Sequence, residues 1–216
     1  MFITLEGIEG CGKTTQINHL ITFFEKRGQP CVVTREPGGT AIGKQIRSIL
    51  LNPASTGLVP KAELLLYMAD RAQHIESLVK PCLSEGKVVI CDRYFDATVV
   101  YQGYARGLDT QFIHDLHRTV LDDLKPDITF LLDLSPRIGL ARAWKQLDEG
   151  SRSGTESRFE QEAFDFHEKV RSGYLELARL EPERFRVIDG AQTENKVQAD
   201  IQGVLTEYLD KKELGL

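Results

Sequence analysis

The sequence predicts an α/β protein in three layers, with a five-stranded parallel sheet flanked by helices on both faces. Short apolar runs alternate with longer amphipathic stretches along the chain, a pattern typical of strand–helix units. The chain has 216 residues and is 41% hydrophobic, which suits one domain with one core. No internal repeat or low-complexity tract interrupts the alternation. We therefore expect residues 1–216 to form a single domain.

Five short apolar runs are the expected strands, because each is long enough for a buried strand and too short for a helix. They cover residues 2–5, 31–34, 88–91, 128–132 and 185–188. The first run begins at residue 2, so we expect no signal peptide. Strands joined through helices run parallel, so ligands are expected at the carboxyl ends of these strands.

The stretches between these runs carry apolar residues at helical spacing. The expected helices cover residues 14–27, 42–51, 62–85, 110–124, 136–147, 159–180 and 196–209. In the third of them, Leu64, Tyr67, Met68, Arg71 and Ile75 fall on one stripe. Most such stripes face the core, so we expect Arg71 to have an anionic or polar partner.

A glycine-rich loop joins the first strand to the first helix. Residues 7–14 fit the pattern G-x-x-x-x-G-K-[ST], in which backbone N–H groups and a helix N-terminus bind phosphates. Lys13 is expected at the β- and γ-phosphates, and the Thr14 hydroxyl at Mg²⁺. The candidate phosphate-binding residues are Gly7, Ile8, Glu9, Gly10, Cys11, Gly12, Lys13, Thr14 and Thr15. The sequence thus predicts binding of a nucleoside triphosphate with Mg²⁺.

Charge and cysteine content exclude several other classes. The formal net charge of −5 argues against a general nucleic-acid-binding protein. The four cysteines show no C-x-x-C spacing, so we expect reduced thiols. No apolar run approaches the length needed to cross a membrane. We expect a cytoplasmic protein without a membrane or nucleic-acid partner.

Three arginines near the ends of neighbouring strands indicate a second phosphate site. Arg35 follows the second strand, Arg47 lies in the next helix, and Arg93 follows the third strand. Guanidinium groups bind phosphate with directional, charge-assisted hydrogen bonds. Asp92 ends the third strand, where an acid can hold Mg²⁺, although it could instead cap a following helix.

One polar segment, about residues 148–158, departs from the alternating pattern. It contains two glycines and lies between two expected helices. It could be a solvated connector, but loops of this length are commonly functional, so we interpret it as a lid that carries Arg152 and Arg158.

Several motifs together resemble bacterial thymidylate kinases (dTMP kinases), a family of P-loop nucleoside monophosphate kinases. Besides the phosphate loop, they are Thr-Arg-Glu-Pro-Gly-Gly-Thr (34–40), Glu-Leu-Leu-Leu-Tyr-Met-Ala-Asp-Arg-Ala-Gln-His (63–74), Asp-Arg-Tyr (92–94) and Tyr-Gln-Gly (101–103). The resemblance runs from residue 2 to about 180 and implies the P-loop kinase fold. It also implies in-line transfer of the γ-phosphoryl group of ATP to dTMP, which gives dTDP for dTTP synthesis. Such proteins are typically homodimers.

The resemblance implies a role for each matching residue. Glu9 would accept a hydrogen bond from the sugar 3′-OH, and Tyr101 would pack beside the sugar and leave no room for a 2′-OH. The acceptor phosphate would be surrounded by Arg35, Arg47 and Arg93. The base would be bound by Tyr67 through stacking, by Arg71 at a thymine carbonyl, and by Thr98 and Gln102 through hydrogen bonds. The catalytic groups would be Lys13, Arg93 and a lid arginine, with Arg152 the first candidate and Arg158 the second.

Two positions depart from the family pattern. Ala97 stands where a serine is common, and Ser157 stands where an aspartate usually precedes the lid arginine. The first departure leaves open a nucleoside monophosphate kinase of the same fold with a different base. A nucleotide-dependent switch is a further alternative, but its N-K-x-D motif fails at Gln198 in the run 195–198.

Overall fold

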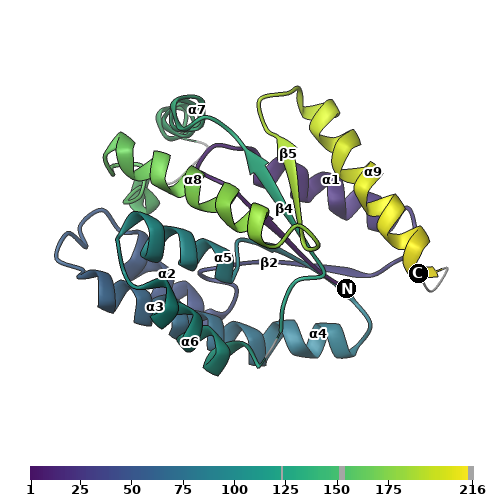
Figure 1. Ribbon diagram of the computed structural model, residues 1–216, viewed down its shortest axis with the longest axis horizontal. Helices are drawn as coiled ribbons and strands as arrows, with labels where there is room; N and C mark the ends of the chain where they lie inside the picture. The colour runs from purple at the N-terminus through teal and green to yellow at the C-terminus, as the bar shows by residue number, and fades with distance from the viewer. Residues whose placement is uncertain (123, 151–153, 214–216) are drawn as a thin grey trace.

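The sheet has five parallel strands, as expected, and their order is β2-β3-β1-β4-β5. The computed structural model describes residues 1–122, 124–150 and 154–213 (Figure 1). The strands are β1 (Phe2–Glu6), β2 (Cys31–Arg35), β3 (Val88–Asp92), β4 (Ile128–Asp133) and β5 (Phe185–Asp189). Each ends one residue later than predicted, on a charged residue. The reason is that backbone pairing, which sets the end of a strand, does not require an apolar side chain.

Helices cover both faces of the sheet. Helix α1 (Lys13–Glu25) packs against α9 (Glu194–Glu213), and α8 (Phe164–Leu180) packs against β4 and β5. Figure 1 shows α8 on one side of β4 and β5, with α1 and α9 on the other. Hydrophobic residues of β1, β3, β4 and β5 lie in one continuous core, and Cys31 of β2 packs against it. The prediction of a three-layer α/β fold is therefore confirmed.

The remaining helices surround the carboxyl edge of the sheet or connect its strands. They are α2 (Ala41–Leu51), α3 (Pro60–His74), α4 (Lys80–Ser84), α5 (Phe95–Thr98), α6 (Thr110–Leu121) and α7 (Pro136–Asp148), with a short 3₁₀ turn at Gly154–Glu156. In the part of the chain that the structure describes, no helix combines the length and the apolar character needed to cross a membrane.

The predicted helix 62–85 is wrong as a single regular helix. A π-helical segment, Ile75–Val79, separates α3 from α4. A second π-helical segment, Val99–Ala105, continues α5 and was not predicted. Side-chain periodicity does not reveal where an i→i+5 bond replaces an i→i+4 bond, and such segments are frequent at functional sites.

Two other helix boundaries differ from the prediction. The helix expected from residue 159 begins at Phe164, because Ala163 has an extended backbone and the residues before it form turns. Phe159 is buried nonetheless, and its ring lies 5.3 Å from that of Tyr101. Helix α6 stops at Leu121 because Asp122 adopts a left-handed conformation with φ 44°.

Candidate active site

The phosphate loop has the conformation that its glycines predict. Gly7, Gly10 and Gly12 have φ of 133°, 68° and 103°, which L side chains rarely adopt. At Gly10, a Cβ would lie 2.1 Å from the carbonyl oxygen of Gly139, so a side chain is also sterically excluded there. The loop leads directly into the N-terminus of α1 at Lys13. Backbone N–H groups and the positive end of the helix dipole thus meet at one place.

A cavity of about 700 Å³ opens above this loop; we call it the phosphate cavity. Loop residues 9–15 all line it. Gly7 and Ile8 lie behind it, and their carbonyl oxygens accept hydrogen bonds from Lys13 Nζ at 3.2 and 3.1 Å. Lys13 is buried at the cavity wall, held by the loop that it serves. An anion in this cavity would meet N–H donors and a preplaced ammonium group.

Asp92 and Thr14 have the chemistry expected of residues near a magnesium ion. Both line the phosphate cavity, and Asp92 Oδ1 is buried without a hydrogen-bond partner in the structure. The alternative role of Asp92 as a helix cap is excluded, because the residue before α5 is Tyr94. No cluster of three metal-binding side chains occurs among the described residues. That donor set fits Mg²⁺, which commonly keeps water and phosphate oxygens as most of its ligands.

Arg93 lies at the centre of a buried polar cluster beside the loop. Its backbone is left-handed, with φ 65°. Its Nη2 donates to Gly7 O at 2.9 Å, to Glu9 Oε1 at 3.0 Å and to Tyr101 Oη at 2.9 Å. Tyr101 Oη in turn donates to Glu9 Oε1 at 2.6 Å. Burial alone would raise the pKa of the Glu9 carboxyl, but Arg93 and the other donors hold that pKa well below its usual range. Glu9 is therefore an ionised acceptor.

The three predicted phosphate-clamping arginines come together. Arg35, Arg47 and Arg93 all line the phosphate cavity, although Arg35 ends β2, Arg47 lies in α2 and Arg93 follows β3. Arg35 is exposed, whereas Arg47 forms a bidentate ion pair with Glu156, with Nε–Oε1 at 2.9 Å and Nη2–Oε2 at 2.8 Å. The clamp thus includes one arginine that is already bound to the predicted lid segment.

A second cavity, which we call the base cavity, adjoins the first. It is lined by Glu9, Glu36, Pro37, Arg47, Leu51, Tyr67, Arg71, Arg93, Tyr94, Ala97, Thr98, Tyr101, Gln102, Glu156, Phe159 and Glu160. The set includes every residue predicted to bind the base or the sugar. Glu9, Glu36, Arg47, Arg93 and Glu156 line both cavities. Two ligands, one in each cavity, would therefore meet at Arg93 and Arg47.

Arg71 has the anionic partner that its position on a helix stripe predicted. Its Nε donates to Glu36 Oε2 at 2.7 Å, and both side chains are almost fully buried. Its Nη1 donates to Thr98 Oγ1 at 3.0 Å, and Nη2 to the carbonyl oxygen of Tyr94 at 3.1 Å. The other carboxylate oxygen of Glu36 lies 2.8 Å from His74 Nδ1. The guanidinium is thereby fixed at the wall of the base cavity.

The predicted lid is described in part. Arg152 lies outside the described residues. Arg158 Nη2 donates to Glu63 Oε2 at 2.6 Å, and its Nε donates to the carbonyl oxygen of Leu50. In this arrangement the Arg158 side chain is bound to α2 and α3 rather than to the phosphate loop.

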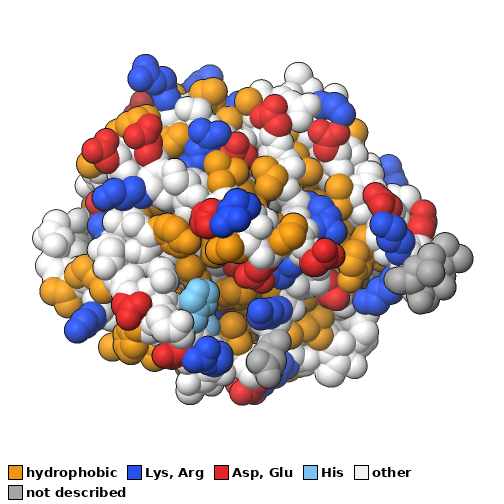
Figure 2. Space-filling view, in the orientation of Figure 1, with side chains coloured by type: hydrophobic (Ala, Val, Ile, Leu, Met, Phe, Trp, Pro, Cys, Tyr) orange, Lys and Arg blue, Asp and Glu red, His pale blue; other side chains and the backbone are white. Residues whose placement is uncertain are grey.

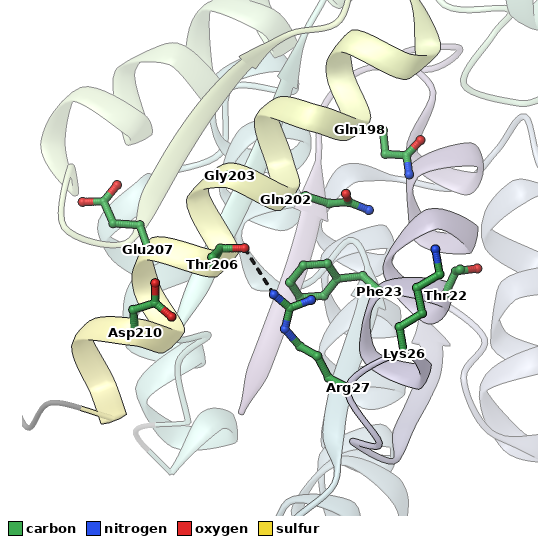
Figure 3. Close-up of a pocket in the computed structure, with 10 residues that line it drawn as sticks. All are labelled: Thr22, Phe23, Lys26, Arg27, Gln198, Gln202, Gly203, Thr206, Glu207 and Asp210. Atoms are coloured by element: carbon green, nitrogen blue, oxygen red, sulfur yellow. Dashed lines mark hydrogen bonds between the residues drawn. The ribbon is translucent and has the colours of Figure 1, made fainter.

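Two further surface features bear on where ligands bind. A hollow between the C-terminal part of α1 and α9 is lined by Phe23, Arg27 and Thr206, among others (Figure 3). It shares no lining residue with the phosphate or base cavity, and the Arg27 guanidinium covers the Phe23 ring at 3.8 Å.

On the face shown in Figure 2, basic and acidic side chains are intermingled. Arg35, Arg47 and Arg93 converge at the phosphate cavity, where acidic side chains such as Glu9 and Glu156 also line the wall.

Comparison with known proteins agrees with this geometry. The thymidylate kinase family profile matches residues 5–201. The chain is 57% identical over 189 residues to a thymidylate kinase of Desulfosudis oleivorans, covering 88% of each chain, and 46% identical to one of Desulfovibrio desulfuricans over the full length of both. The chain belongs to the thymidylate kinase family. The crystal structure of thymidylate kinase from Ehrlichia chaffeensis is similar, with a TM-score of 0.73, 35% identity, and coverage of 95% of this chain and 98% of that one.

The two departures from the thymidylate kinase pattern have local structural outcomes. Ala97 lines the base cavity and adds no polar group there. Ser157, at the position usual for aspartate, donates from Oγ to the carbonyl oxygen of Gly154 at 2.8 Å and so closes the short 3₁₀ turn.

Sequence reasoning missed several carboxylates that hold the predicted residues in place. Glu36 binds Arg71, Glu63 binds Gln102 and Arg158, and Glu6 accepts hydrogen bonds from Tyr94 N at 2.8 Å and Tyr174 Oη at 2.7 Å. Glu63 precedes Tyr67 and Arg71 at intervals of four residues, so its place on their helical stripe was a usable signal.

Proposed function

We infer that the chain phosphorylates dTMP to dTDP with ATP as the phosphoryl donor. Family membership gives the reaction, and one structural observation supports it for this chain. The phosphate cavity and the base cavity meet at residues that line both, with Arg93 among them. A triphosphate on the loop and a nucleoside monophosphate in the base cavity would therefore have their phosphates side by side, as in-line transfer requires.

The chain's own groups account for the catalytic requirements. The acceptor is a phosphate oxygen that is already ionised near neutral pH, so no general base is needed. Lys13 neutralises charge on the donor phosphates, and Arg93 lies where the two phosphates meet. Asp92 and Thr14 would hold Mg²⁺, which neutralises phosphate charge when bound. After the lid segment moves, a lid arginine, Arg152 or Arg158, would place its positive charge beside the negative charge of the transition state.

The acceptor site is proposed to read a deoxyribose and thymine. Glu9 is an ionised acceptor for the 3′-OH, and the Tyr101 ring stands beside it. Tyr67 supplies the stacking surface, while Arg71, Thr98 and Gln102 supply polar groups to the base. The phosphate would be bound by Arg35, Arg47 and Arg93. Release of Arg47 from Glu156 would free its guanidinium for this role.

We also propose that the chain forms a homodimer through α3 and α6. These two helices pack together, and they expose Leu65 and Phe112, which are 56% and 46% accessible. Contiguous exposed apolar surface is typical of association sites. Sedimentation should give twice the chain mass of 24.3 kDa, and a species of single-chain mass at micromolar concentration would contradict this.

The function is tested by ADP release from Mg²⁺–ATP with dTMP, dUMP, UMP, dCMP, AMP and GMP offered separately as acceptors. Turnover with dTMP well above the others is expected. Preferential turnover with another monophosphate would keep the kinase and overturn the thymine assignment. ADP release that needs no acceptor would indicate an ATPase or a switch.

A further inference from the structure

Glu63 connects three segments that meet at the base cavity without itself lining that cavity. It lies in the first turn of α3, one turn before Tyr67, and is 1% exposed. Its Oε1 accepts from Gln102 Nε2 at 2.7 Å, and its Oε2 from Arg158 Nη2 at 2.6 Å. Arg106 approaches both oxygens, at 3.4 and 3.5 Å. A single buried carboxylate thus joins α3, the π-helical segment and Arg158 at the end of the predicted lid segment.

This contact fixes which way the amide of Gln102 faces. An ionised carboxylate accepts hydrogen bonds and donates none, so only the NH₂ group of Gln102 can face Glu63. No described residue donates to Gln102 Oε1. Gln102 lines the base cavity, so its carbonyl oxygen is the group left for a ligand there.

The direction of this amide distinguishes pyrimidine bases. N3 of thymine carries a hydrogen and donates, whereas N3 of cytosine has a lone pair and accepts. A carbonyl oxygen presented to the ring edge accepts from thymine N3–H but faces another acceptor in cytosine. An amide turned by 180° would reverse this preference.

We propose that Glu63 is a positioning residue that sets the orientation of the Gln102 amide and thereby makes the base cavity select a pyrimidine with N3–H. This role rests on the proposed function of the site. Glu63 acts through Gln102 and touches no substrate. Its other partners, Arg106 and Arg158, are also donors, so every contact of this carboxylate requires an acceptor.

Glu63→Gln tests the proposal, because a glutamine both donates and accepts and so lets the Gln102 amide turn. The readout is the ratio of kcat/KM for dTMP to that for dCMP, measured by ADP release. We expect this ratio to fall about tenfold or more, mainly through a higher KM for dTMP. Any loss that acts through the lid or through general stability would lower both rates and leave the ratio unchanged.

Glu162→Gln is the matched control. Glu162 accepts from the same Arg106, at 2.5 Å, but has no contact with Gln102 in the structure. This variant should keep the wild-type ratio. A folded Glu63→Gln variant whose ratio stays within about twofold of wild type would overturn the proposal.

Gln102→Ala shows whether Glu63 acts through Gln102. In that background, Glu63→Gln should change the ratio no further, and an equal change in both backgrounds would refute the proposed route. If Glu63→Gln does not fold, Gln102→Ala remains as a test. An unaltered ratio in that variant would show that the Gln102 amide does not read the base and would overturn the proposal. A wild-type chain without dTMP-dependent ADP release would instead refute the proposed function.

Discussion

Glu36→Gln should destabilise the protein, because it removes the charge that balances a buried guanidinium. Arg71 and Glu36 have side chains that are 1% and 2% exposed, and Nε and Oε2 are 2.7 Å apart. Glutamine keeps the shape of Glu36 but not its charge. It also offers one acceptor oxygen, whereas the two oxygens of Glu36 contact Arg71 and His74 separately.

The magnitude follows from the burial of the pair. Breaking a buried ion pair by removing one partner costs about 3–5 kcal/mol of unfolding free energy. Asp70 also contributes negative charge near Arg71, so we expect a value toward the lower end, about 3 kcal/mol. For a chain of 216 residues, each kcal/mol lowers Tm by about 2–4 °C, so Tm should fall by about 6–12 °C.

Thermal unfolding followed by circular dichroism measures this change. Glu176→Gln is the matched control: Glu176 forms an exposed ion pair with Arg179 at 2.7 Å, so the same substitution should leave Tm unchanged. A Glu36→Gln variant that unfolds within 2 °C of wild type, in the same buffer, would refute the charge-balance argument. The variant should also need more dTMP for half-maximal rate, because Arg71 is no longer fixed beside Thr98.

Three further predictions follow from the site. Arg93→Ala should lower kcat/KM for dTMP on the order of 10³-fold, since the Arg93 guanidinium lies where the two cavities meet. Near-normal turnover would contradict the assignment of Arg93 to the acceptor phosphate. Asp92→Asn should raise the Mg²⁺ concentration for half-maximal rate about tenfold, and an unaltered magnesium titration would remove Asp92 from the metal site. Burial raises the pKa of Glu6 to about 8, so the folded state keeps a proton that the unfolded state releases above about pH 4.5. Stability should therefore fall as pH rises from about 5 to 8, and Glu6→Gln should flatten this slope in urea titrations.

The parts of the site that the sequence predicted depend on short-range patterns. The phosphate loop is encoded by adjacent residues between one strand and one helix, so its conformation follows from local rules. The charged residues at the ends of β2 and β3 were predicted to converge because parallel strands end at the same edge of a sheet. Arg71 was expected to have an anionic partner, and Glu36 confirms this.

The parts that were missed depend on contacts between distant segments. The Glu63–Arg158 ion pair joins residues 95 positions apart, and the contact between Glu9 Oε2 and His167 Nδ1, at 3.4 Å, joins the phosphate loop to α8. Periodicity describes one element at a time and cannot say which elements face each other. The π-helical segment that carries Tyr101 and Gln102 was missed for a related reason, since its backbone is set by packing against α8.

By itself, the sequence determined the fold class and the phosphate loop, because strand–helix alternation and motif spacing are local properties of the chain. The residues expected at the base and sugar were implied by the resemblance to a family, and they line the base cavity together with others that were not predicted. Only the tertiary structure decided how those residues are held. It placed Arg71 against Glu36, Gln102 against Glu63 and Arg47 against Glu156. A buried polar side chain must find a partner, but which partner it finds depends on how separate elements pack in three dimensions.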